Sequence, residues 1–251
     1  TWDDSMRKFV DLHLQPSVKD SDQVEKIVTR SSKLGYRLVG IPLPPNVTQD
    51  KVRQLRGICK DVGIDFVTRL DLTSKTPRQL LHELRRFRRR FEVISVVCTS
   101  KAVARQAAKD RRVDLLSFPA TSSRRRFFDH AEAELASNAS SSLEVDVAPL
   151  LSSKDFLRIR LLSTLRKEVA IAKKFGVPVS ISSGATNLHL MRGPYDCVAL
   201  ASLFNMAVPL ALCALSESPL TIVERNREKL SPDFVAPGIR LVRRKKDCLS
   251  V

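Results

Sequence analysis

Seven short apolar segments recur along the chain, and an amphipathic segment separates each from the next. They begin at Phe9, Arg37, Asp65, Glu92, Val113, Leu143 and Val177. Strands that alternate with helices at a period near 30 residues are typical of βαβ units and a parallel sheet. Several segments are apolar almost throughout, as strands covered on both faces should be. Six or seven such units predict a closed TIM-like α/β barrel, and no G-x-G-x-x-G follows the first strand to favour an open dinucleotide-binding sheet.

The segments between the strands read as helices, and the last strand is followed by helices alone. The amphipathic segments are 22–28, 48–55, 77–90, 101–110, 127–138 and 153–175. No eighth strand is as clear as the seven, and residues 194–230 read as three helices. The prediction is one barrel domain over residues 1–240 with seven clear strands and extra C-terminal helices. Residues 241–251 form a basic tail that we expect to be disordered.

One stretch has nearly the length of a membrane span. Residues 197–215 contain no charged side chain, and a bilayer needs about 20 apolar residues. Asn205 and Pro209 interrupt the stretch, since Asn suits a left-handed helix end and Pro suits the first turn of a new helix. We therefore predict two short buried helices and no membrane association. Residues 1–8 are polar, and we expect no signal peptide there.

The charge of the chain is unusual. It carries 43 Lys+Arg against 27 Asp+Glu, a formal net charge of +16. Such a field favours a polyanionic partner, nucleic acid above all, over a small neutral substrate. A merely solvated basic surface is the simpler alternative. The five cysteines have no C-x-x-C spacing and lie mostly in apolar surroundings, which favours buried free thiols over disulfides or zinc.

The first strand carries a partial metal motif. Asp11 and His13 lie two apart in it, as in many metal-dependent phosphoesterase barrels, but Gln15 stands where a second histidine would follow. The chain has only three other histidines, His82, His130 and His189, with no H-x-H, no H-x-x-H and no carboxylate cluster beside them. Multi-metal hydrolysis needs several such ligands. We therefore expect no metal and no catalytic residue, with Asp11 and His13 bonding to each other or to nearby backbone.

The residues after the seventh strand contain no nucleophile motif. The run SSGA at 182–185 lacks the G-x-S-x-G pattern and an evident base. Its backbone amides could face a phosphate, although a plain turn is the commoner explanation.

Clusters of basic residues indicate a binding function more clearly than the SSGA run does. The predicted helix at 77–90 has an apolar face and many arginines on its other faces, of which Arg85, Arg86, Arg88 and Arg89 are possible RNA contacts. Arg124, Arg125 and Arg126 follow the fifth strand, on the side where a barrel presents its ligands. Guanidinium groups there suit bidentate phosphate contacts. Few aromatic residues accompany them, so phosphate and shape recognition should outweigh base stacking.

Two stretches resemble one family. They are RRVDLLSFP (111–119) and SISSGATNLHLMRGPYDCVALASLF (180–204), in which MRGPYD is the specific block. VAPLL (147–151) and SESPLTIVERNREKL (216–230) are also in keeping. With these, the chain from Phe9 to Leu230 resembles the thirty-kilodalton protein subunit of archaeal and eukaryal ribonuclease P, the archaeal type more closely.

The resemblance implies a TIM-like barrel of the polymerase-and-histidinol-phosphatase type and a role in the RNA-based endonuclease that removes 5′ leaders from precursor tRNA. It implies that catalytic magnesium is held by the RNA and that the chain alone is non-catalytic, with no cofactor. Its partners would be ribonuclease P RNA, a smaller RNA-recognition-like protein subunit, other ribonuclease P proteins and, indirectly, precursor tRNA. The location would be the cytoplasm, or the nucleus and nucleolus in a eukaryote.

The resemblance also suggests RNA-facing residues. They are Arg105, Arg124, Arg125, Arg126, His130, Lys174 and Arg192. The arginine run at 85–90 and the basic tail depart from the family pattern, which leaves their role open. Two other functions remain possible, a stand-alone metal-dependent phosphoesterase of the related barrel family and a basic scaffold unconnected with ribonuclease P.

Overall fold

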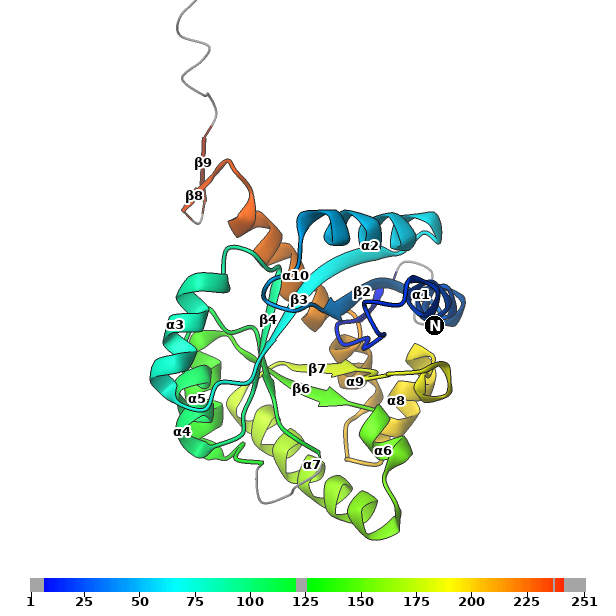
Figure 1. The fold of residues 1–251 in the computed structure, drawn as a ribbon. Helices are drawn as coiled ribbons and strands as arrows, with labels where there is room; N and C mark the ends of the chain where they lie inside the picture. The colour runs from blue at the N-terminus through cyan, green and yellow to red at the C-terminus, as the bar shows by residue number, and fades with distance from the viewer. Residues whose placement is uncertain (1–6, 121–125, 237, 242–251) are drawn as a thin grey trace, which may run out of the picture.

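A computed structural model describes residues 7–120, 126–236 and 238–241. Its centre is a seven-stranded parallel sheet in which each strand pairs with the next along the chain. The strands are β1 (Phe9–Asp11), β2 (Tyr36–Pro42), β3 (Asp65–Leu72), β4 (Val93–Val97), β5 (Leu115–Ser117), β6 (Ser142–Asp146) and β7 (Val179–Ser182). All seven predicted strands are confirmed, and the sheet curves into a nearly closed TIM-like barrel (Figure 1).

The barrel closes between its first and last strands. A single parallel bridge joins Leu14 to Ala185, and the amide of Gln15 donates to the Ala185 carbonyl at 2.9 Å. On the other side of β1, the Leu14 amide donates to the Gly40 carbonyl at 3.0 Å. Gly40 is needed there, because a Cβ at this position would lie 2.6 Å from the Leu12 carbonyl oxygen. The described residues add no eighth strand to this sheet, as predicted.

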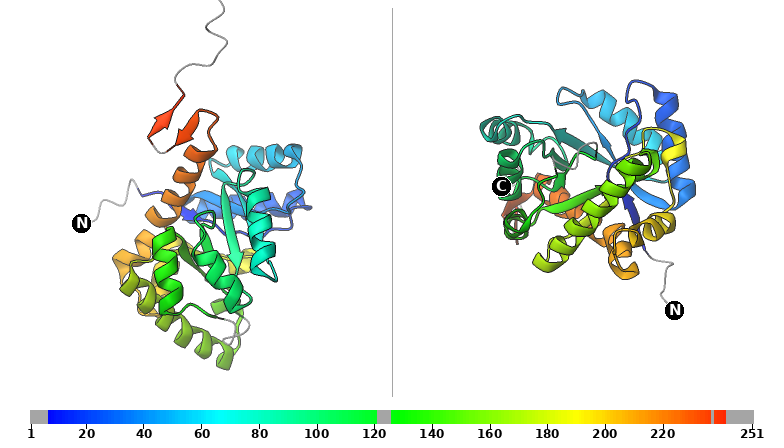
Figure 2. Two further views of the ribbon diagram at one scale, coloured as in Figure 1. Left: turned by 90° about the vertical axis from the view of Figure 1, so that its left-hand side faces the viewer. Right: turned by 90° about the horizontal axis from the view of Figure 1, so that it is seen from below.

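Helices follow the strands and cover the outside of the sheet (Figures 1 and 2). Those between strands are α1 (Ser21–Leu34), α2 (Gln49–Asp61), α3 (Pro77–Phe87), α4 (Lys101–Ala108), α5 (His130–Ala139), α6 (Ala148–Ser152) and α7 (Asp155–Phe175). Asp20, Thr48, Thr76, Ser100 and Asp129 each cap a helix by accepting a backbone amide from its first turn. These caps are short polar side chains, which satisfy amides that the helix itself cannot.

The chain after β7 forms a short 3₁₀ turn (Leu188–Leu190) and three helices, α8 (Pro194–Ser202), α9 (Val208–Ala214) and α10 (Glu217–Leu230). The predicted break at Asn205 is confirmed, since its φ of 61° lies in the left-handed region, and Pro209 lies in the first turn of α9. None of the helices in the described ranges has the length and apolar character that crossing a bilayer requires.

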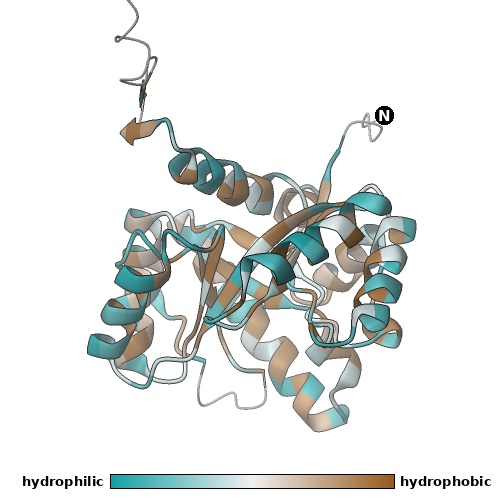
Figure 3. Ribbon diagram, turned by 45° about the horizontal axis from the view of Figure 1, so that its top comes forward, coloured by the Kyte–Doolittle hydropathy of each residue, from teal (hydrophilic) through white to brown (hydrophobic). Residues whose placement is uncertain are grey.

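The interior of the barrel has an apolar floor and a polar upper layer. Inward-facing side chains of the strands pack on Ile222 and Val223 of α10, which lies across the N-terminal ends of the strands. These side chains are Val10, Leu12, Leu38, Val67, Val93 and Leu115. Figure 3 shows the apolar strands inside and the polar outer faces of the helices. Charged side chains fill the layer toward the C-terminal ends of the strands, and they form the first candidate site.

Four details differ from the predictions. Helix α3 ends at Phe87, because Arg88–Arg90 turn into β4, and α5 begins at His130, because Asp129 is its cap. A two-stranded hairpin of β8 (Phe234–Ala236) and β9 (Ile239–Arg240), which the sequence did not predict, follows α10. Cys59, Cys98 and Cys197 are buried free thiols as expected, whereas Cys213 is only half-buried. Cys248 and residues 242–251 of the basic tail lie outside the described residues.

Candidate functional site

The upper layer of the barrel holds a cluster of ionic side chains. Arg69 of β3 is fully buried and binds Glu144 of β6 through two hydrogen bonds, of which Nη2 to Oε2 measures 2.7 Å. Its Nε donates to Asp71 at 2.6 Å, and its Nη1 donates to the Leu12 carbonyl at 3.0 Å. A buried guanidinium therefore has an anionic or carbonyl acceptor on each of its nitrogens, as its desolvation demands.

His13 lies beside this arginine. Its Nδ1 is 2.9 Å from Asp146 Oδ1 and its Nε2 is 3.3 Å from Asp71 Oδ2. Burial and the charge of Arg69 act to lower the pKa of His13, but Asp146 and Asp71 outweigh them and raise it to about 10. His13 is accordingly an imidazolium at neutral pH. Gln15, at the position where a second histidine was sought, contacts the ring on its Nε2 side.

Asp11 and the SSGA turn bond to each other. Asp11 Oδ1 accepts the backbone amides of Ser183 at 2.9 Å and of His13 at 3.1 Å. This confirms the expected pairing with backbone, and it uses the amide of Ser183 that could have faced a phosphate. Burial raises the pKa of Asp11, and its Oδ2 has no hydrogen-bond partner among the described residues. Gly184 holds φ at 60°, and a Cβ there would lie 2.9 Å from the Asp146 side chain.

The expectation that no carboxylates accompany the histidines was wrong for His13. Asp71, Glu144 and Asp146 converge on it from β3 and β6, which the sequence separates by more than 70 residues. Oxygen and nitrogen atoms of His13, Glu144 and Asp146 come within 4.8 Å of one another, close enough in principle for a metal ion. The donor set does not fit one, because Arg69 occupies both oxygens of Glu144 and places its own positive charge beside the group. The cluster is an internal ionic lock in which Arg69 supplies the cation.

The predicted basic residues near the fifth strand have structural partners. Arg126 binds both oxygens of Glu168 on α7 and donates to the Phe118 carbonyl at 2.8 Å, with only 4% of its side chain exposed. Arg105 of α4 donates to both oxygens of Asp129 at 2.7 Å and to Glu132 at 3.1 Å. Arg126 is thus enclosed in a salt bridge and Arg105 is largely engaged. Arg124 and Arg125 lie outside the described residues.

Two other predicted residues come together. His130, at the start of α5, and Lys174, near the end of α7, are exposed and share the ring of Phe175. The imidazole is tilted by 39° against the Phe175 ring, with 5.5 Å between centroids, and the Lys174 ammonium lies 5.8 Å from the ring centroid. This pair presents cationic and hydrogen-bonding groups on the same side of the barrel as Arg105.

Arg192 and the MRGPYD block anchor α8. Arg192 Nη1 donates to the carbonyls of His189 and Met191, and its own carbonyl accepts the Tyr36 hydroxyl at 3.1 Å. The Asp196 carboxylate accepts the Gly193 amide at 3.0 Å at the start of the helix. Much of this block therefore stabilises the junction between α8 and β2.

The arginines at the end of α3 and in the turn after it have different roles. Arg85, Arg86 and Arg89 are exposed, and Arg86 lies over the Phe87 ring at 5.2 Å. Arg88 is half-buried and donates to Asp114 and to the carbonyls of Phe91, Glu92 and Arg112. Among the described members, Arg105, Arg126 and Arg88 are bound to acidic or carbonyl groups within the fold, whereas His130, Lys174, Arg85, Arg86 and Arg89 are exposed. The sequence analysis did not identify Arg69 as a site residue. The available signal was its position as a charged residue inside an otherwise apolar strand.

Comparison with known proteins agrees with the resemblance. Residues 8–231 match the family model described as RNase P subunit p30. "Ribonuclease P protein component 3" of Methanococcoides burtonii is 27% identical over 235 residues, 94% of each chain. That of Methanothermobacter thermautotrophicus is 28% identical over 242 residues, 94% of this chain and 96% of the relative. A chain in the cryo-EM structure of archaeal ribonuclease P with mature tRNA has the same fold, with a TM-score of 0.80, 22% identity and coverage of 94% of this chain and 99% of that one.

Proposed function

The chain belongs to the RNase P subunit p30 family, and we propose that it works as a non-catalytic, RNA-binding protein subunit within that tRNA 5′-processing endonuclease. The observation that carries the proposal is the family match over residues 8–231, which spans the whole barrel. The net charge of +16 supports an RNA partner, because phosphate neutralisation dominates affinity for nucleic acid. By lowering repulsion between RNA segments, the subunit would reduce the magnesium that the active RNA fold requires.

The ionic lock supports a subunit without its own metal chemistry. Arg69 binds both oxygens of Glu144 and one oxygen of Asp71, so its guanidinium engages the buried carboxylates of the upper layer. We therefore propose that the catalytic magnesium belongs to the RNA. Elemental analysis and a phosphodiesterase assay on the purified chain test this. We expect neither bound metal nor turnover, and one equivalent of retained zinc or manganese together with turnover would favour the phosphoesterase instead.

Arg124 and Arg125 remain the first residues to test in the RNA role, with Arg126 left intact because it holds Glu168. Precursor-tRNA cleavage by ribonuclease P RNA and its protein subunits should need more magnesium when this chain is omitted. The Arg124→Ala/Arg125→Ala variant should shift the magnesium midpoint in the same direction. An unchanged midpoint on omission of the chain would contradict the function, and an unchanged midpoint in the variant would remove only this loop.

The proposal includes a smaller protein partner and the cytoplasm as the place of action, as the resemblance implies. Co-purification of the tagged chain with RNA and proteins from its source organism tests the assembly. Ribonuclease P RNA in the eluate is the expected result, and recovery of unrelated RNAs alone would favour a general basic scaffold.

A further inference from the structure

A cavity of about 500 Å³ lies at the N-terminal end of the barrel, the end opposite to the ionic lock. The end of α3, the turn between α4 and β5, the end of α10 and the β8–β9 hairpin surround it. Figure 2 shows the hairpin and the end of α10 projecting from this end of the molecule. The cavity is lined by Arg88, Arg89, Arg111, Arg112, Asn226, Lys229, Leu230, Ser231, Phe234 and Val235.

Three cations of this lining lack a counterion. The side chains of Arg89, Arg111 and Lys229 make no hydrogen bond or ion pair with any residue in the described ranges, and all three residues are exposed. Partial burial and the charges of Arg225, Arg88 and Arg111 lower the pKa of Lys229, whereas Asp114 acts to raise it. Such an excess of positive charge is costly unless an anion joins it.

The carboxylates around the cavity are already paired. Asp114 binds both Arg88 and Arg225, at 2.5 and 2.8 Å, and Asp110 binds Arg112 at 2.6 Å. At the rim, Glu228 binds Arg240 at 2.8 Å. These pairs position the walls, and they leave no carboxylate among them for the three unpaired cations.

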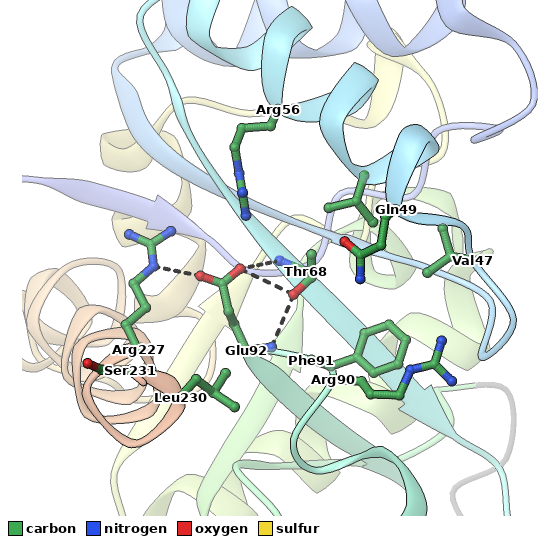
Figure 4. Close-up of a pocket in the computed structure, with 11 residues that line it drawn as sticks. Val47, Gln49, Arg56, Thr68, Arg90, Phe91, Glu92, Arg227, Leu230 and Ser231 are labelled. Carbon is green, nitrogen blue, oxygen red and sulfur yellow. Dashed lines mark hydrogen bonds and ion pairs between the residues drawn. The ribbon is translucent and has the colours of Figure 1, made fainter. Parts of the chain in front are cut away.

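A second cavity, of about 280 Å³, continues the basic surface on the other side of α10 and shares Leu230 and Ser231 with the first. In Figure 4 Arg227 points to Glu92, whose other oxygen accepts from Thr68, while Arg56 reaches toward the pocket from α2. Neither Arg56 nor Arg90, which also lines this pocket, forms an ion pair with a described residue. The unpaired cations of both cavities thus flank the end of α10.

We infer that the cavity lined by Arg89, Arg111 and Lys229 is a binding site for the RNA phosphate backbone, which nothing in the family resemblance assigns. Guanidinium groups match phosphate oxygens bidentately, and the ammonium adds a point charge. Phe234 and Val235 offer an apolar wall to a ribose or base, as single-stranded RNA requires. The site rests on the proposed function, and it would let RNA contact the barrel at the end opposite to the ionic lock.

Salt-dependent binding of the full chain to its cognate ribonuclease P RNA tests the site. In Arg89→Ala/Arg111→Ala/Lys229→Ala we expect about tenfold weaker binding and a slope of log K against log salt shallower by about 2, roughly 0.7 for each lost contact. The matched control is Lys26→Ala/Arg30→Ala/Lys33→Ala, which removes three exposed cations of α1 and the same charge. Arg89→Lys/Arg111→Lys should retain the slope, and it keeps the test open if the alanine variant melts early.

The outcomes separate this site from the function as a whole. If the wild-type chain neither binds ribonuclease P RNA nor alters the magnesium requirement, the proposed function fails. If it binds and the cavity variant matches the α1 control, the cavity alone is wrong. Loss of binding to another protein subunit with an unchanged RNA slope would also overturn the inference, since it would assign the cavity to an acidic protein surface.

Discussion

At the residue scale, the same arginine signal in the sequence corresponds to two different roles. Arg126 and Arg89 both belong to basic runs that read as RNA contacts. In the structure Arg126 is enclosed with Glu168, whereas Arg89 has no partner among the described residues. Sequence could not separate them because Glu168 lies 42 residues further along the chain, within a long amphipathic helix. Runs of charge predict a basic surface well but do not reveal which members are paired within the fold.

The enclosed arginine makes a stability prediction. Arg126→Ala should lower the free energy of unfolding by about 3–5 kcal/mol, because it leaves Glu168 buried without a partner. Urea denaturation measures the loss. Arg126→Met/Glu168→Met is the control and should recover most of it, since no uncompensated charge remains. Equal losses in the single and double variants would show that packing, rather than charge, holds this junction.

His13 gives the chain a pH dependence. Its pKa is about 10 when folded and near 6.5 when unfolded, so its contribution is complete below pH 6.5 and disappears as pH rises through 10. Between about pH 7 and 9 the unfolded chain has released this proton and the native chain retains it. The free energy of unfolding should therefore fall by about 1.4 kcal/mol per pH unit over that range. His13→Gln should flatten this part of the profile, while exposed His130→Gln should not. Parallel profiles for wild type and His13→Gln would exclude an imidazolium in the lock.

At the element scale, periodicity predicted most of the fold. All seven strands and the three helices after β7 lie where the apolar pattern placed them. The role of α10 was not predictable, because amphipathicity shows that a helix buries one face but not what that face covers. Its Ile222 and Val223 form the floor of the barrel. The β8–β9 hairpin was also missed, since its strands of three and two residues are too short to show alternation.

The floor formed by α10 can be tested with one side chain. Ile222→Ala should lower the free energy of unfolding by about 2–5 kcal/mol, because it leaves a cavity among the inward-facing strand residues. Thermal or urea unfolding measures this. The neighbouring Glu224→Ala is exposed and should change stability by less than about 0.5 kcal/mol. A small loss in both variants would mean that α10 can leave the barrel without unfolding it.

At the scale of the whole molecule, the net charge predicted the class of partner but not the place of contact. Many of the arginines neutralise acids within the fold, as Arg88, Arg105, Arg126 and Arg227 do. The excess that gives +16 is therefore carried by the remaining cations. Those of the N-terminal cavity come from the turn after α3, the α4–β5 turn and α10, which only the barrel brings together. Long separation in sequence hid this site, just as it hid the carboxylates around His13.

Basic groups at both ends of the barrel predict that one RNA contacts both at once. Arg89 and Arg111 precede β4 and β5, and Lys229 lies near the end of α10, whereas Arg124 and Arg125, which lie outside the described residues, follow β5 in the sequence. Changes at separate sites add when each acts independently. Combining Arg89→Ala/Arg111→Ala/Lys229→Ala with Arg124→Ala/Arg125→Ala should therefore make the salt slope shallower by about 3.5, roughly 0.7 for each of the five contacts. The measurement is the salt-dependent binding of ribonuclease P RNA to the combined variant, compared with binding to the cavity variant and to the Arg124→Ala/Arg125→Ala variant. If it binds no more weakly than the cavity variant, the RNA touches only one end of the barrel at a time.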